Sequence, residues 1–153
     1  MLKVGDQLPN ISLNDQDGNL VNLQEFKGKN PLVVYFYPKD DTPGCTKEAC
    51  EFRNENDQFK QYDAKIFGIS GDSEKSHQRF IAKHSLNFSL LSDKGRKAEK
   101  AFGVPRSLFG LLPGRVTFVA DKEGVIQHIL NSQTDARRHT HESLKMLKRL
   151  AEG

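Results

Sequence analysis

The chain has 153 residues, the length of one ordinary domain, and a chain of this size folds without a metal or disulfide staple. Its 23 basic residues nearly balance its 20 acidic ones; the net charge of +3 argues against a nucleic-acid-binding surface and against a highly charged disordered chain. The longest apolar run, residues 32–37, is far shorter than the ~20 residues of a membrane-spanning helix, so we expect no membrane role.

Hydrophobic periodicity and turn residues predict alternating strands and helices in one compact domain over residues 1–153, without repeats or linkers. The predicted strands cover residues 10–13, 19–23, 31–37, 65–70, 89–91, 115–120 and 125–130. The predicted helices cover residues 45–62, 73–84, 96–102 and 140–150, with Ser73 as an N-cap. This order predicts an α/β fold with a sheet covered on both sides.

The two cysteines and the N-terminal residues 1–6 bear on the compartment. Residues 1–6 have neither the apolar core of a signal peptide nor an Arg/Ser-rich transit character. We therefore expect a cytoplasmic protein, or an organelle protein whose targeting segment is absent from this chain. In a reducing compartment, a cysteine pair is inert, metal-binding or redox-active more often than it is a structural disulfide.

The segment of residues 38–50, PKDDTPGCTKEAC, places Cys45 where a buried strand turns into a helix. A free thiol is only about 3 % thiolate at neutral pH, and the positive end of a helix favours the anion. Cys45 is therefore predicted to be the better nucleophile of the two cysteines. It shares a helix face with Phe52 and Phe59, which predicts a shallow pocket on the core side.

Cys50 follows five residues later. In an intact helix the two Cα atoms would lie about 8–9 Å apart, and a disulfide needs them within about 7 Å. The pair can bond only if the first turns of the helix unwind, which indicates a redox cycle coupled to local unfolding.

Simpler interpretations stay open for these residues. The cysteines could be two small apolar residues, and a zinc site is disfavoured because no second Cys or His pair has ligand spacing. A dithiol of the C-x-x-C type is absent. Glu48 either pairs with Arg115 or is solvated. The histidines are predicted to lie at the surface without a metal; they are His77, His84, His128, His139 and His141.

The pattern Pro38-x-x-x-Thr42-x-x-Cys45 resembles the peroxidatic motif of peroxiredoxins, and Cys50 resembles the second cysteine of their Q-type (bacterioferritin-comigratory) subgroup. The similarity extends over nearly the whole chain. Residues 112–118, LPGRVTF, are similar to the strand that carries the family's active-site arginine, here Arg115.

The resemblance implies a thioredoxin-like fold: a central mixed β-sheet flanked by helices, with an N-terminal β-hairpin extension. It implies an atypical two-cysteine peroxidase that reduces hydrogen peroxide and organic hydroperoxides without metal or cofactor, in antioxidant defence and redox homeostasis. Cys45 would be the peroxidatic cysteine and Cys50 the resolving one, joined in an intramolecular disulfide. Thr42 would bind the peroxide, Arg115 would hold the thiolate, and Pro38 would shield the site from water.

The expected partners are the hydroperoxide and thioredoxin or a related dithiol reductant, and the expected state is a monomer. Two other hypotheses compete with this one. A redox sensor would use the same disulfide to signal to a partner and would need no fast recycling. A peroxidase-derived scaffold with inert cysteines would have an unreactive Cys45.

Overall fold

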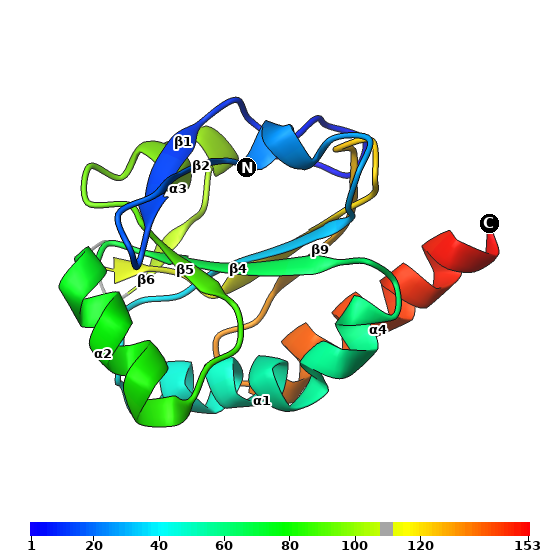
Figure 1. Cartoon of the computed structure of the whole chain (residues 1–153). Helices are drawn as coiled ribbons and strands as arrows, with labels where there is room; N and C mark the ends of the chain where they lie inside the picture. The colour runs from blue at the N-terminus through cyan, green and yellow to red at the C-terminus, as the bar shows by residue number, and fades with distance from the viewer. Residues whose placement is uncertain (108–111) are drawn as a thin grey trace.

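The computed structural model describes residues 1–107 and 112–153 (Figure 1). The strands are β1 (Ser12–Asp15), β2 (Leu20–Asn22), β3 (Leu32–Phe36), β4 (Lys65–Ser70), β5 (Ser89–Ser92), β6 (Arg106–Ser107), β7 (Leu112–Pro113), β8 (Val116–Ala120) and β9 (Ile126–Asn131). The helices are α1 (Pro43–Lys60), α2 (Glu74–His84), α3 (Lys97–Phe102), α4 (Ala136–Glu152) and the short 3-10 helix η1 (Leu23–Phe26).

The main sheet has the strand order β2-β1-β5-β4-β3-β8-β9. Strands β3, β4 and β5 are parallel, and the remaining pairs in this sheet are antiparallel. The expected mixed sheet is therefore confirmed. The N-terminal hairpin β1–β2 belongs to the same sheet, because β1 pairs with β5.

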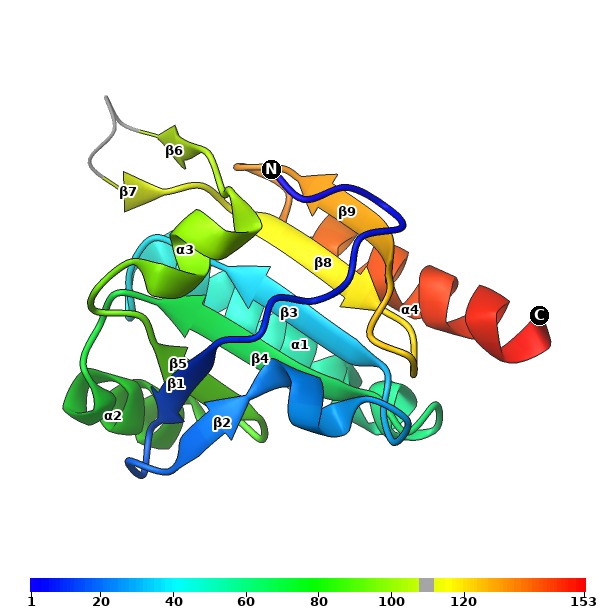
Figure 2. The same ribbon diagram turned by 90° about the horizontal axis from the view of Figure 1, so that it is seen from above.

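Both faces of the sheet are covered, as predicted. Strand β3 is buried along its whole length, and its side chains alternate between two cores. Val33 and Tyr35 belong to the core between the sheet and the helices α1, α2 and α4; Figure 1 shows these helices on one face of the sheet. Val34 and Phe36 belong to the core on the other face, where α3 lies and the N-terminal segment crosses the strands (Figure 2).

The predicted bounds differ from the structure at two helix starts and at the first strand, because β1 (Ser12–Asp15) lies two residues later than the predicted 10–13. Helix α1 begins at Pro43, two residues before the predicted start, because Thr42 takes the extended N-cap conformation and Pro43 suits the first turn. Helix α4 begins at Ala136, with the side chain of Asp135 accepting from the N–H of Arg138. The first turn of α4 was missed because it buries a histidine rather than an aliphatic side chain.

The sequence predicts no strand between residues 102 and 115, but in the structure β6 pairs with β7 in a separate two-stranded ribbon that projects from the body (Figure 2). Residues 108–111 of that segment lie outside the described residues. Within the described parts of the chain, no helix is both long and apolar enough to cross a membrane.

Candidate active site

Cys45 is the third residue of α1, directly after the connection from the end of β3. It is 1 % exposed and packs in the core that contains Tyr37, Ala49 and Phe52. The prediction that it lies on the core side is confirmed, and it is more enclosed than a shallow pocket would make it. Because it lies in the first turn, the backbone N–H groups around it have no partner within the helix.

Burial raises the pKa of the Cys45 thiol, the reverse of what the helix terminus alone predicts. Hydrogen bonds from Thr42 and from the backbone of Lys39, together with the charge of Arg115, oppose this rise, and Glu48 adds to it. Thr42, Lys39 and Arg115 therefore stabilise the thiolate only to the extent that they replace the hydration that burial removes.

Thr42 and Pro38 lie on the connection that precedes Cys45. The Thr42 side chain does not cap the helix; its hydroxyl donates to the carbonyl of Lys39 at 3.0 Å and lies near enough to Cys45 to lower the pKa of its thiol. Pro38 lies two residues after the end of β3, is partly buried and lines a cavity of about 310 Å³ at the carboxyl ends of the parallel strands. Thr42 is therefore close to Cys45, whereas Pro38 lies beside a cavity whose lining does not include Cys45, Thr42 or Arg115.

A buried hydrogen-bonded cluster holds this connection against α2. The Tyr37 hydroxyl donates to Asp40 Oδ1 at 2.5 Å, and His77 Nδ1 lies 2.7 Å from Asp40 Oδ2. His77 Nε2 lies 3.1 Å from the carbonyl of Leu91. The ring of His77 therefore bridges Asp40, on the connection, and the end of β5. The prediction of a surface position for His77 is wrong: it is fully buried.

Arg115 reaches the site although it lies 70 positions after Cys45 in the chain. The pairing of β8 with β3 sets Val116 opposite Phe36, so the residue before β8 lies beside the end of β3. A Cβ added to Gly44 would lie only 2.5 Å from Arg115 Nη2. The guanidinium therefore rests against the backbone of the first turn of α1, next to Cys45.

Glu48, one turn after Cys45, is fully buried and not solvated. Its Oε1 lies 3.5 Å from Arg115 Nη1, and its Oε2 lies 3.6 Å from His139 Nδ1. Burial raises the pKa of Glu48 to about 8, against the opposing effect of Arg115. His139 is 1 % exposed, so its predicted surface position is also wrong.

Sequence reasoning missed two features of this site. Nothing in the spacing showed that Gly44 makes room for the guanidinium, although a glycine at the second position of a helix is unfavourable and could have been a signal. The burial of His139 was missed because α4 was expected to start at the following residue.

Cys50 is partly buried on the same helix, and both thiols are free. Helix α1 is continuous through both residues, which agrees with the prediction that the pair cannot bond while the helix is formed. In the described ranges 1–107 and 112–153, no group of three or more His, Cys, Asp or Glu side chains could hold a metal ion.

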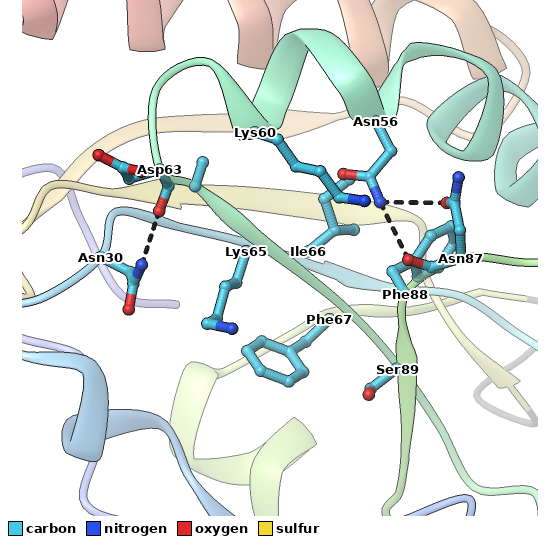
Figure 3. Close-up of a pocket in the computed structure, with 11 residues that line it drawn as sticks. Asn30, Asn56, Lys60, Asp63, Lys65, Ile66, Phe67, Asn87, Phe88 and Ser89 are labelled. Atoms are coloured by element: carbon cyan, nitrogen blue, oxygen red, sulfur yellow. Dashed lines mark hydrogen bonds between the residues drawn. The ribbon is translucent and has the colours of Figure 1, made fainter.

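A second cavity, of about 390 Å³, lies at the opposite edge of the sheet (Figure 3). Lys60 near the end of α1, Lys65 at the start of β4 and Ser89 at the start of β5 line it. It is far along the strands from the carboxyl ends, where Cys45 and Arg115 lie. This cavity is therefore not part of the thiol site.

Comparisons with known proteins agree with the geometry. Residues 4–129 match the family described as AhpC/TSA. The chain is 53 % identical over 146 residues to "Peroxiredoxin Q, chloroplastic" of Oryza sativa subsp. japonica, covering 95 % of this chain and 67 % of that protein. The protein of the same name from Sedum lineare is also 53 % identical, with 95 % and 78 % covered.

Solved structures are similar over nearly the full length of both chains. The crystal structure of peroxidoxin BcpB from Mycobacterium tuberculosis matches with a TM-score of 0.90 and 34 % identity, covering 98 % of this chain and 99 % of that one. A mutant of PrxQ from Xylella fastidiosa matches with a TM-score of 0.89 and 34 % identity, covering 99 % and 98 %.

Proposed function

The chain belongs to the AhpC/TSA family and is a thiol-dependent peroxidase of the peroxiredoxin Q type, and we propose that Cys45 attacks the hydroperoxide and Cys50 resolves the product. The thioredoxin-like peroxiredoxin fold is that of the PrxQ structures. The substrate is a hydroperoxide and the reductant is of the thioredoxin type, as in the family.

One observation carries the assignment of roles: Thr42, Arg115 and the first turn of α1 converge on the Cys45 sulfur. The thiolate attacks one peroxide oxygen, the S–O bond forms and the O–O bond breaks. The leaving oxygen takes a proton and departs as water or an alcohol, while Cys45 becomes a sulfenic acid. Donors aimed at the charge that develops on the leaving oxygen stabilise the transition state more than the ground state.

Arg115 and Thr42 have separate tasks in this proposal. The guanidinium supplies the positive charge that favours the thiolate and the departing oxygen, and it is held within reach by the backbone of Gly44. The Thr42 hydroxyl would turn its hydrogen from the Lys39 carbonyl to the Cys45 sulfur or to the bound peroxide. Pro38 covers the carboxyl end of β3 and limits the access of water.

Cys50 acts in the second step. Its thiolate attacks the Cys45 sulfur, the S–S bond forms, and the sulfenic oxygen leaves as water after taking a proton. This step needs the start of α1 to unwind, because the helix holds the two residues too far apart. A dithiol reductant then attacks the exposed disulfide and returns both residues to thiols.

The remaining assignments are also part of the proposal. The reductant is thioredoxin, the working state is a monomer, and residues 1–153 act as one domain, which is supported by one main sheet that carries both cores. The location is the cytoplasm, although the plant relatives are named chloroplastic. Size-exclusion chromatography and cell fractionation test the monomer and the location.

The test of the catalytic roles is peroxide consumption with a thioredoxin recycling system, comparing wild type, Cys45→Ser and Cys50→Ser. We expect Cys45→Ser to abolish turnover and Cys50→Ser to permit one oxidation but no recycling. A wild-type protein that oxidises once and then stalls with thioredoxin present would favour the redox sensor. A Cys45 that does not react with peroxide would overturn the assignment.

A further inference from the structure

Glu48 and His139 face each other in a fully buried position beside the proposed catalytic arginine. Glu48 comes from α1 and His139 from the first turn of α4, and both are at most 1 % exposed. Within the part of the chain that the structure describes, Oε2 of Glu48 has no hydrogen-bond partner, and it lies 3.6 Å from His139 Nδ1. Oε1 makes a long contact of 3.5 Å with Arg115 Nη1.

The surroundings of His139 fix where its protons can lie. Nε2 is 2.8 Å from the backbone carbonyl of Ser132, which can only accept, so Nε2 carries a hydrogen. Nδ1 is 2.6 Å from the hydroxyl of Thr117, which can either donate to a neutral ring or accept from a charged one. A neutral His139 therefore turns the lone pair of Nδ1 toward the Thr117 hydroxyl and the carboxyl of Glu48.

This arrangement is unfavourable for an ionised Glu48 beside a neutral His139. A buried carboxylate oxygen without a donor would then face an imidazole lone pair, and the desolvation of the charge would be uncompensated. One added proton removes the conflict, whether it is on Glu48 Oε2 or on His139 Nδ1. Either placement gives the pair a net charge of zero.

We propose that Glu48 and His139 together hold one buried proton, and that this proton keeps the charge of Arg115 available to the Cys45 thiolate. With the proton bound, the three side chains of Arg115, Glu48 and His139 carry a net charge of +1. Without it, Glu48 neutralises Arg115 and the thiolate loses its counter-charge. His139 thus acts through Glu48 and Arg115 as a positioning residue. The inference rests on the proposed roles of Cys45 and Arg115.

The titration behaviour of the neighbours supports this assignment. Burial raises the pKa of Glu48 to about 8 and lowers the pKa of His139, so the neutral forms of both are favoured near neutral pH. The interacting charged or titratable groups come from several elements: Tyr35 on β3, Cys45 on α1, Arg115 before β8, and Arg138 and Glu142 on α4. Among them Arg115 is the cation in direct contact with Glu48.

The first test follows the rate of Cys45 oxidation by peroxide as a function of pH, in a single turnover of wild type and Glu48→Gln. We expect the wild-type rate per thiolate to fall about tenfold as pH rises through 8, because the counter-charge is lost. The glutamine in Glu48→Gln cannot ionise, so the rate per thiolate should not fall in this pH window. At pH 9 this variant should therefore be oxidised faster than wild type. The same fall in both proteins would overturn the proposal.

The second test needs no variant of the buried pair. Carbon-13 shifts of the Glu48 carboxyl and nitrogen-15 shifts of the His139 ring should change with one common midpoint near pH 8. His141→Asn, which alters an exposed residue on α4, should keep this midpoint and the wild-type rate profile. A Glu48 carboxyl that is already ionised at pH 6 beside a neutral His139 ring would overturn the proposal.

The two tests separate this inference from the proposed function. If wild-type Cys45 consumes peroxide but the pH profile is unaffected by Glu48→Gln, the shared proton is wrong and the peroxidase assignment stands. If Cys45 does not react, the proposed function itself fails, and the shift measurement still decides whether the pair holds a proton.

Discussion

Gly44 is the residue through which the backbone of α1 and the side chain of Arg115 come into contact. A side chain at this position would meet Nη2 at 2.5 Å and Cζ at 3.2 Å, both atoms of a flexible side chain. The guanidinium can therefore move away without disrupting the fold, but it would then leave the neighbourhood of Cys45. A substitution at Gly44 should therefore change the activity without a comparable change in stability.

Replacing Gly44 by alanine should slow the oxidation of Cys45 by about tenfold to a hundredfold, since losing one aligned charge donor costs about that much or more. Stability should change little, because alanine is a better helix former by roughly 1 kcal/mol and offsets the displaced contact. Stopped-flow oxidation and thermal unfolding measure the two effects.

The matched control for this substitution is Gly95→Ala, because no atom of the described residues lies within 4 Å of a Cβ at that position and its φ is not positive. It should keep the wild-type rate. If Gly44→Ala also reacted at the wild-type rate, the contact between Arg115 and the first turn of α1 would have no role in catalysis.

At the scale of single residues, the sequence predicted which residues carry the chemistry better than it predicted which polar residues are buried. The motif identified Cys45, Thr42 and Arg115, and the structure brings these three together. The burial of His77 and His139 was missed, because periodicity places apolar residues in a core and cannot find a polar one whose partners come from distant segments. For the same reason Glu48 could not be assigned to the core.

At the scale of elements, the start of α1 lies between two fixed points. Before it, Asp40 is held by His77, and Asp41, with a positive φ of 60°, contacts Lys83 at 2.8 Å. After it, Phe52 stacks on Tyr35 with ring centroids 4.6 Å apart. Between these points lie both cysteines, so the unwinding that a disulfide requires can be confined to about two turns.

We therefore expect backbone amides of residues 46–50 to lose protection from hydrogen exchange when the protein is oxidised to the disulfide. Amides from Phe52 onward in α1 should stay protected, because the stacked aromatic core holds them. Hydrogen exchange with mass spectrometry measures this on the reduced and oxidised protein.

Cys50→Ser treated with one equivalent of peroxide is the control for this prediction, since its Cys45 is oxidised without a disulfide and α1 should stay protected. An oxidised wild type that keeps the protection of residues 46–50 would contradict the need for unwinding. Loss of protection over all of α1 would contradict its confinement by Phe52.

At the scale of the whole molecule, the order of strands and helices could be predicted because burial on both faces leaves long apolar runs, as in β3 and β4. The pairing of β1 with β5 and of β8 with β3 could not be derived from periodicity alone, because long-range pairing leaves no local pattern. Yet these pairings decide the site: the second one carries Arg115 to Cys45. The family resemblance supplied that link.

The pH dependence of global stability follows from the same buried pair. The folded protein holds one proton on Glu48 and His139 up to about pH 8, whereas the unfolded chain loses its carboxyl proton near 4.5 and its imidazole proton near 6.5. Between pH 4.5 and 6.5 both states hold one proton, so this pair contributes no slope. Between pH 6.5 and 8 the folded state holds one more proton than the unfolded state, and the free energy of unfolding should fall by about 1.4 kcal/mol per pH unit.

In Glu48→Gln the folded His139 is neutral, so the free energy of unfolding should rise up to pH 6.5 and then stay level. Urea unfolding at pH 5.5, 6.5, 7.25 and 8 measures the free energy of unfolding of both proteins, with steps of ~0.75 pH unit where the wild-type value should fall. Parallel pH dependences in wild type and Glu48→Gln would contradict the shared proton.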